Sequence, residues 1–207
     1  MQKIRLITLF TTLLIIIISC QQNATIKNKV IETKNNDFEK VVFDILDAFN
    51  KKDETKINHL INNNYKVAVL YRRGTFDNIE IVDSIKISTP IPEYLPYDYQ
   101  HSLSDNEIKY EELPEYSCDT EQWNKPTGIY CDTITVDTSR SRIATNEKKY
   151  DLKDWKDSEL SNIKINEKIS RKIIVIGKTG ETFIFFVTKD KDHWYLSGID
   201  RFEACSA

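Results

Sequence analysis

The last third of the chain most constrains the fold, because it carries three apolar runs rich in β-branched and aromatic residues. These runs are 173–176 (IIVI), 182–188 (TFIFFVT) and 193–199 (HWYLSGI), separated by the turn sequences 177–180 (GKTG) and 189–192 (KDKD). Short connections between such runs predict an antiparallel meander of three strands. The middle run is apolar on both faces, so we expect it to lie centrally with a helix packed on one face.

Two helices and a strand are predicted ahead of this meander. An amphipathic helix is expected at residues 38–49, where the apolar side chains recur with helical spacing. Asp53 can cap a second, shorter helix that ends in Asn62-Asn63-Asn64. Residues 65–71 alternate as in a strand, and the pattern of residues 76–87 fits either a helix or strands. The helical spacing of its apolar residues favours a helix up to about Ile85.

Residues 88–145 form the least regular part of the sequence. Three prolines interrupt its first ten residues, tyrosines are dense, and acidic residues gather in its middle. A long irregular insert in a domain is unusual unless it is functional or cross-linked. The whole pattern predicts an α+β domain over residues 37–207, with N-terminal helices on a curved antiparallel sheet and a disulfide-stapled insert at about 88–145.

The N-terminal residues have the layout of a secretory signal peptide. Lys3 and Arg5 precede an apolar run at 6–18, which is shorter than the roughly 20 residues that span a bilayer as a helix. The sequence Ile-Ile-Ser-Cys ending at Cys20 resembles the lipobox of bacterial lipoproteins. This resemblance implies cleavage after residue 19, lipid attachment to Cys20 and anchoring in the cell envelope. Residues 20–36 are polar and are expected to form a flexible tether.

The charge balance argues against nucleic acid as a partner. Without Lys3 and Arg5, 27 basic residues face 32 acidic ones, a net charge of −5. Nucleic-acid binding requires clustered positive charge, and an acidic chain is also not expected to be drawn to anionic lipid headgroups. The membrane is therefore expected as a partner only through the lipid on Cys20, beside an unknown envelope ligand or protein.

Three cysteines remain in the exported chain, where an oxidising compartment favours a disulfide. Cys118 and Cys131 would close a short loop around Trp123. The alternative joins Cys205 to one of these two cysteines. A zinc site is a third option, although no Cys-x-x-Cys occurs and no histidine has ligand spacing from a cysteine. We predict the Cys118–Cys131 bridge and no metal.

The order of elements resembles that of the NTF2-like (cystatin-like α+β roll) proteins. The resemblance rests on the first amphipathic helix, the short second helix, the strand Tyr65–Tyr71 with the following residues 73–76, and the final strand with Trp194-Tyr195-Leu196. It covers residues 37–87 and 170–202, and the insert departs from it. It implies a pocket between helices and sheet, and both enzymes and binding proteins share such a fold.

Few residues suggest catalysis. Walker A, Gly-x-Gly-x-x-Gly and His-Glu-x-x-His motifs are absent from the sequence, so no cofactor is predicted. In an alternative role as a small-molecule enzyme of NTF2-like type, His193, Asp200 or a pocket tyrosine is the acid–base candidate. A further alternative is an inhibitor or immunity-type protein with a protruding rigid loop.

The favoured hypothesis is that the protein is a membrane-tethered, non-catalytic lipoprotein that binds a ligand or partner. Its binding residues are expected in the aromatic insert, at Tyr97, Tyr116 and Trp123.

Overall fold

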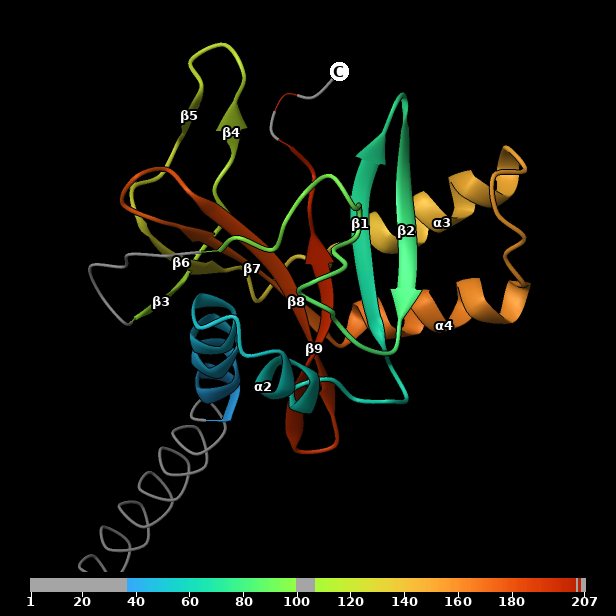
Figure 1. Cartoon of the computed structure of the whole chain (residues 1–207), viewed down its shortest axis with the longest axis horizontal. Coiled ribbons are helices and arrows are strands. Elements are labelled where there is room, and N and C mark those ends of the chain that lie inside the picture. The colour runs from blue at the N-terminus through green and yellow to red at the C-terminus, as the bar shows by residue number, and fades with distance from the viewer. Residues whose placement is uncertain (1–36, 100–106, 204, 206–207) are drawn as a thin grey trace, which may run out of the picture. The chain divides into compact units, whose positions relative to one another are not determined.

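A seven-stranded mixed sheet, mostly antiparallel, organises the computed structural model, which describes residues 37–99, 107–203 and 205. The strand order is β2-β1-β9-β8-β7-β6-β3 (Figure 1). The β1–β9 and β3–β6 pairs are parallel, and the other neighbours are antiparallel. The predicted α+β class is therefore confirmed.

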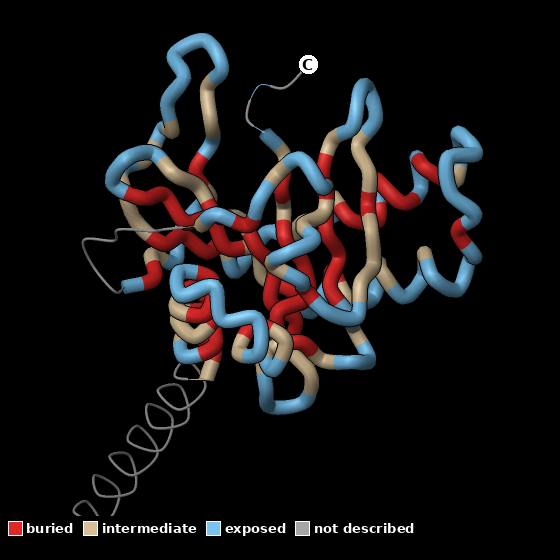
Figure 2. Tube along the Cα trace, in the orientation of Figure 1, coloured by how far each residue is buried: buried red, intermediate tan, exposed pale blue. Residues whose placement is uncertain are grey.

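The predicted three-strand meander is also confirmed. It consists of β7 (Ser170–Ile176), β8 (Thr182–Asp190) and β9 (His193–Asp200). As expected, β8 lies between β7 and β9, and buried stretches are concentrated in these strands and in β1 (Figure 2). The alternating side chains of β8 serve both faces, because Phe183 and Phe185 point to one face and Phe186 to the other.

Helices cover both faces of the sheet. On one face lie the helix at residues 37–50 and α2 (Glu54–His59); Phe49 of the former has its ring centroid 4.8 Å from that of Phe183. The other face carries α3 (Ser139–Lys149) and α4 (Asp157–Lys168), where Ile143 packs in a buried cluster with Phe186. Both early helices agree with the sequence pattern.

The predicted helix at residues 76–85 is wrong. Residues Phe76–Val82 form β2, paired along its length with β1 (Val67–Arg73). Gly74 adopts a φ of +66°, which permits the tight turn between the two strands. The sequence Asn78-Ile79-Glu80-Ile81 alternates with a period of two, and α3 packs on its apolar side, so the strand alternation outweighed the helical spacing.

The insert is more regular than its sequence suggested. It contributes four short strands and the start of α3: β3 (Ile108–Tyr110), β4 (Tyr116–Ser117), β5 (Gln122–Trp123) and β6 (Gly128–Cys131). Strands β3 and β6 extend the main sheet, whereas β4 and β5 form a separate hairpin that extends away from it (Figure 1).

The predicted Cys118–Cys131 bridge is wrong, and the alternative with Cys205 is confirmed. The disulfide joins Cys118 to Cys205, with a Cα–Cα distance of 5.6 Å. Cys131 lies inside β6, paired with Ile173 of β7 and fully buried, whereas Cys118 lies in the exposed β4–β5 turn. Burial raises the pKa of the Cys131 thiol to about 11.

The predicted signal peptide, Cys20 and the tether at 20–36 lie outside the described residues. Within the described part of the chain, none of the helices combines the length and the apolar character needed to cross a bilayer.

Candidate functional site

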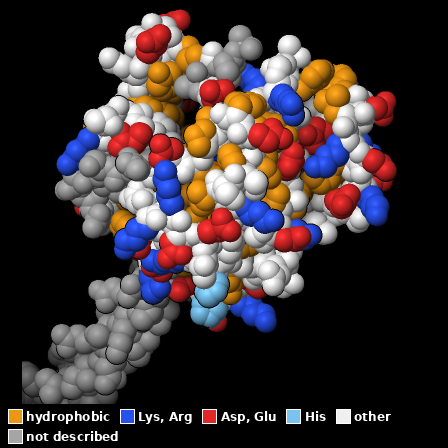
Figure 3. Space-filling view, viewed as in Figure 1, with side chains coloured by type: hydrophobic (Ala, Val, Ile, Leu, Met, Phe, Trp, Pro, Cys, Tyr) orange, Lys and Arg blue, Asp and Glu red, His pale blue; other side chains and the backbone are white. Residues whose placement is uncertain are grey.

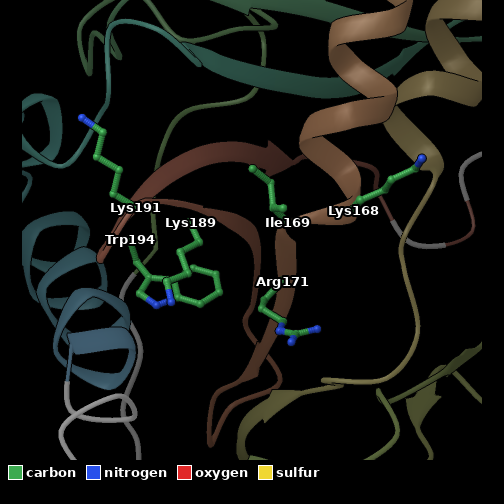
Figure 4. A pocket seen from close by; sticks show the side chains of 6 residues that line it. All are labelled: Lys168, Ile169, Arg171, Lys189, Lys191 and Trp194. Carbon is green, nitrogen blue, oxygen red and sulfur yellow. The ribbon is translucent and has the colours of Figure 1, made fainter.

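A basic groove lies between the C-terminal end of α4 and the β8–β9 hairpin. This basic groove has a volume of about 490 Å³. The six residues that line it are Lys168, Ile169, Arg171, Lys189, Lys191 and Trp194. In Figure 4, Lys168 and Lys191 lie at opposite ends, with Trp194 and Lys189 side by side between them.

Strand register brings these residues together from separate parts of the sequence. Lys189 and Trp194 are direct cross-strand partners in β8 and β9, and Arg171 pairs with Val187, two residues before Lys189. Arg171, Lys189 and Trp194 therefore share one face of the sheet. The backbone N–H of Lys189 donates to the carbonyl of Ile169 at 3.1 Å, which fixes the end of α4 against β8.

The electrostatics of the basic groove favour an anion. Four of its six lining side chains are cationic, and none is a carboxylate. Lys189 Nζ lies 6.0 Å from the Trp194 ring centroid, and Arg171 Nη1 donates to the Thr133 carbonyl at 2.6 Å. On the face shown in Figure 3, by contrast, acidic and basic side chains are interspersed. The positive charge of the basic groove is thus a local reversal in a chain of net charge −3.

Asp190, which lies between Lys189 and Lys191 in the sequence, is held by other partners. Asp190 accepts hydrogen bonds from Asn62 Nδ2 at 3.2 Å and from the Tyr65 hydroxyl at 3.4 Å. Burial raises the pKa of Tyr65, and the Asp190 carboxylate adds to this shift. These contacts attach the β8–β9 hairpin to the segment after α2, and so hold the wall of the basic groove in place.

A second charged cluster is buried on the face covered by α3 and α4. Lys172 Nζ lies 3.2 Å from Asp137 Oδ2 and 3.3 Å from Asp200 Oδ2. Arg140 is buried beside them, with its guanidinium 4.8 Å from the Phe186 ring centroid, and Glu167 accepts a hydrogen bond from the Ser141 N–H at 2.8 Å.

One ammonium in this cluster serves two carboxyl groups with different pKa shifts. Burial raises the pKa of Asp200, and Lys172 offsets this only in part. Burial also pushes the pKa of Asp137 upward, but Lys172 and Ser139 outweigh it and hold that pKa below its usual value. Asp200 therefore takes up a proton before Asp137 as the pH falls.

The predicted acid–base candidates are separated in the structure. Asp200 lines a hollow of about 310 Å³ with Tyr99, Arg201 and Phe202, and its carboxylate is bound by Lys172 and by the Phe202 N–H. His193 is exposed at the start of β9, at the opposite end of that strand. Only Asp200, of these two candidates, therefore lines this hollow in the described part of the chain.

The three aromatic residues predicted to bind a ligand do not form one surface. Tyr97 is only 2 % exposed and contacts Phe49 and the Arg201 guanidinium, so it is a core side chain. Tyr116 and Trp123 pair across the β4–β5 hairpin with ring centroids 5.3 Å apart. Trp123 Nε1 also donates to Thr182 Oγ1 at 3.1 Å, which attaches this hairpin to the main sheet.

The basic groove was missed because its residues look unremarkable in the sequence. The run 189–192 alternates lysine with aspartate and has the pattern of a solvated turn, and Lys168 and Arg171 flank an ordinary helix end. The signal that was available is the pairing of Lys189 with Trp194 in a predicted hairpin, since cross-strand partners lie on one face.

No family model, curated protein or solved structure matches the chain. Within the described residues, histidine, cysteine and acidic side chains form no group of three or more that could hold a metal ion.

Proposed function

We propose that this chain is a membrane-tethered lipoprotein, anchored through Cys20, that binds an anionic ligand in the basic groove without transforming it. The observation that carries the proposal is the lining of the basic groove, with four cationic side chains and no carboxylate. Phosphate and carboxylate groups are the anions that lysine and arginine bind best. The lipobox resemblance supports a location in the cell envelope.

The geometry favours binding over chemistry. Lysine ammonium groups are flexible point charges that suit the holding of an anion, and none of the six lining residues is a histidine or a carboxylate. Trp194 adds a flat apolar surface beside these charges, which suits a ligand with an apolar or sugar portion next to its anionic groups.

Removal of two groove charges tests the proposal. In the full-length protein, Lys168→Gln/Lys191→Gln should weaken binding of inorganic tripolyphosphate, measured by calorimetry, by about tenfold or more. Each exposed charge contact contributes about 1 kcal/mol, and two such contacts are removed. Binding by the unaltered protein should also weaken as salt is added.

A matched control separates the basic groove from net charge. Lys86→Gln/Lys178→Gln removes two exposed lysines outside the basic groove and changes the net charge equally. This variant should bind tripolyphosphate as the unaltered protein does. Equal weakening in both double variants would contradict a specific site in the basic groove.

We also propose that the domain is a variant of the NTF2-like roll. The helix at 37–50, the short α2, the β1–β2 hairpin and the C-terminal meander support this relation. The two helices α3 and α4 on the opposite face of the sheet, together with the insert, are departures from the resemblance. The relation accounts for the architecture but does not decide the function, because proteins of one fold perform different functions.

A second candidate function, inhibition of a partner protein, is favoured by the β4–β5 hairpin. Its turn at Cys118–Glu121 is exposed and is fixed by the disulfide to Cys205 and by the Trp123–Thr182 hydrogen bond. A rigid protruding loop is suited to entering a partner's cleft. Asp119→Lys/Glu121→Lys should then abolish cross-links between the turn and a partner in intact cells, whereas Lys86→Gln/Lys178→Gln should leave them unchanged.

A further inference from the structure

A pair of exposed isoleucines extends the basic groove along α4. Ile165 is 56 % exposed and Ile169, which lines the basic groove, is 41 % exposed. They are four residues apart, as are Lys164 and Lys168, so each pair lies along one side of the helix end. Exposed isoleucines at this spacing, next to lysines and a tryptophan, form a surface that is apolar and cationic at once.

The cationic groups of this surface diverge. Lys168 and Lys191 lie at opposite ends of the basic groove and their side chains extend away from each other (Figure 4). Such an arrangement does not converge on one small phosphate. It matches an extended anionic surface, where each ammonium meets a different headgroup.

We infer that the basic groove, together with Lys164 and Ile165, docks the domain onto a bilayer containing anionic lipids. This inference rests on the proposed anion-binding function and specifies the source of the anion as lipid headgroups. The lysines and Arg171 bind headgroup phosphates, Ile165 and Ile169 enter the boundary with the acyl chains, and Trp194 lies at the level of the headgroups.

The chemistry of each residue type fits this position. Lysine stems cover apolar surface while their ammonium groups stay at the headgroups. Tryptophan prefers the interface because its ring is apolar and its indole N–H is polar. The expected net repulsion between an acidic chain and anionic lipid is overcome locally, since charges beyond about one Debye length are screened.

The docked state can be measured with the full-length chain reconstituted in vesicles of phosphatidylcholine alone or with phosphatidylglycerol added. Bromine atoms near the headgroup end of the acyl chains quench tryptophans at the interface, and Trp194→Phe identifies the contribution of Trp194. We expect quenching that depends on Trp194 in the anionic vesicles and little in the neutral ones. Lys168→Gln/Lys191→Gln should lower the ratio of docked to undocked protein roughly 25-fold, because each basic side chain contributes about fivefold to this ratio.

Ile165→Ser distinguishes the bilayer from a soluble anion. This side chain is 56 % exposed and does not line the basic groove, so the variant should keep the thermal unfolding midpoint and the tripolyphosphate affinity, yet lose much of the quenching. The control Lys86→Gln/Lys178→Gln should retain it. Unchanged tripolyphosphate binding without quenching in anionic vesicles would overturn the inference and leave the proposed function standing. Absence of both tripolyphosphate binding and quenching in the unaltered protein would overturn the inference and the proposed function together.

Discussion

At the scale of single residues, Asp200 shows how burial competes with an ion pair. Its side chain is 7 % exposed and lies 3.3 Å from Lys172, yet burial raises its pKa above the ordinary 3.8. Lys172 also lies 3.2 Å from Asp137, so its ammonium is shared between two carboxylates. The ionised form of Asp200 is therefore less stable in the folded protein than in the unfolded chain.

The pH dependence of stability follows from this shift. A carboxyl group with a raised folded pKa binds its proton more tightly in the folded state, so it costs stability as the pH rises from about 3.8 through the folded pKa. Asp200→Asn removes this titration and keeps an oxygen that can accept the Phe202 N–H. The free energy of unfolding of the unaltered protein, minus that of Asp200→Asn, should fall across this window, as measured by urea denaturation at several pH values.

An exposed aspartate provides the control for this prediction. Asp119→Asn removes a carboxylate from the β4–β5 turn and corrects for the loss of one acidic charge. A difference for Asp200→Asn that rises with pH over the same window would show that Lys172 outweighs burial.

At the scale of elements, Arg201 fixes the segment at residues 91–99 to the end of β9. Its guanidinium donates to the carbonyls of Ile91, Leu95 and Pro96 and to the Tyr99 hydroxyl, and it lies 4.1 Å from the Tyr97 ring centroid. Asp200 and Arg201 are neighbours in the sequence, but their side chains bind different partners. A side chain that is 4 % exposed and holds three carbonyls is structural.

Truncation of this side chain should be strongly destabilising. Arg201→Ala removes three hydrogen bonds from a charged group, each of which contributes about 1.5–3 kcal/mol when buried. Because none of the accepting residues is fully buried, water can replace part of this bonding, and a loss of about 3 kcal/mol is expected. Arg201→Lys keeps the charge and part of the bonding and should lose less. Urea denaturation measures both, with the exposed Arg73→Ala as control. A loss under about 1 kcal/mol for Arg201→Ala would contradict this role.

Local periodicity predicted the elements whose burial pattern is unambiguous. The helix at 37–50, α2 and β1 each show one clear period, and the meander consists of apolar runs separated by short turns. Residues 76–82 satisfied both periods, and only packing against α3 and pairing with β1 decided the outcome. The edge of β2 is also covered in a way that no local pattern shows: the Ile79 N–H donates to Glu147 at 3.0 Å, and Lys153 donates to the Ile79 carbonyl at 2.9 Å.

Long-range features could not be predicted from the local sequence, for a different physical reason. The basic groove depends on the register of β8 with β9 and on the contact between the end of α4 and Lys189. Each of these is set by tertiary packing and not by the residues next to it in sequence. Disulfide pairing is similar, since three cysteines allow several pairings and only the folded geometry selects one.

At the scale of the whole molecule, the disulfide links distant parts of the chain. Cys118 and Cys205 are 87 residues apart, so the bridge joins the β4–β5 hairpin to the segment that follows the last strand. The enclosed loop contains α3, α4 and the whole meander. A cross-link of this kind restricts the unfolded chain over nearly half of its length.

Removal of the disulfide should therefore act on stability more than on the folded structure. For a loop of this length, the chain-entropy estimate is about 4–5 kcal/mol, and Cys118→Ala/Cys205→Ala should lose up to that amount in urea denaturation. Cys118 and Cys205 are exposed, so the substitutions leave no buried cavity. Cys131→Ala, which truncates a buried thiol outside the bridge, should lose about 1 kcal/mol and keep the disulfide. A double variant no less stable than Cys131→Ala would contradict this prediction. It would mean that residual structure around the hairpin already restricts the unfolded chain, so that the cross-link removes little further entropy.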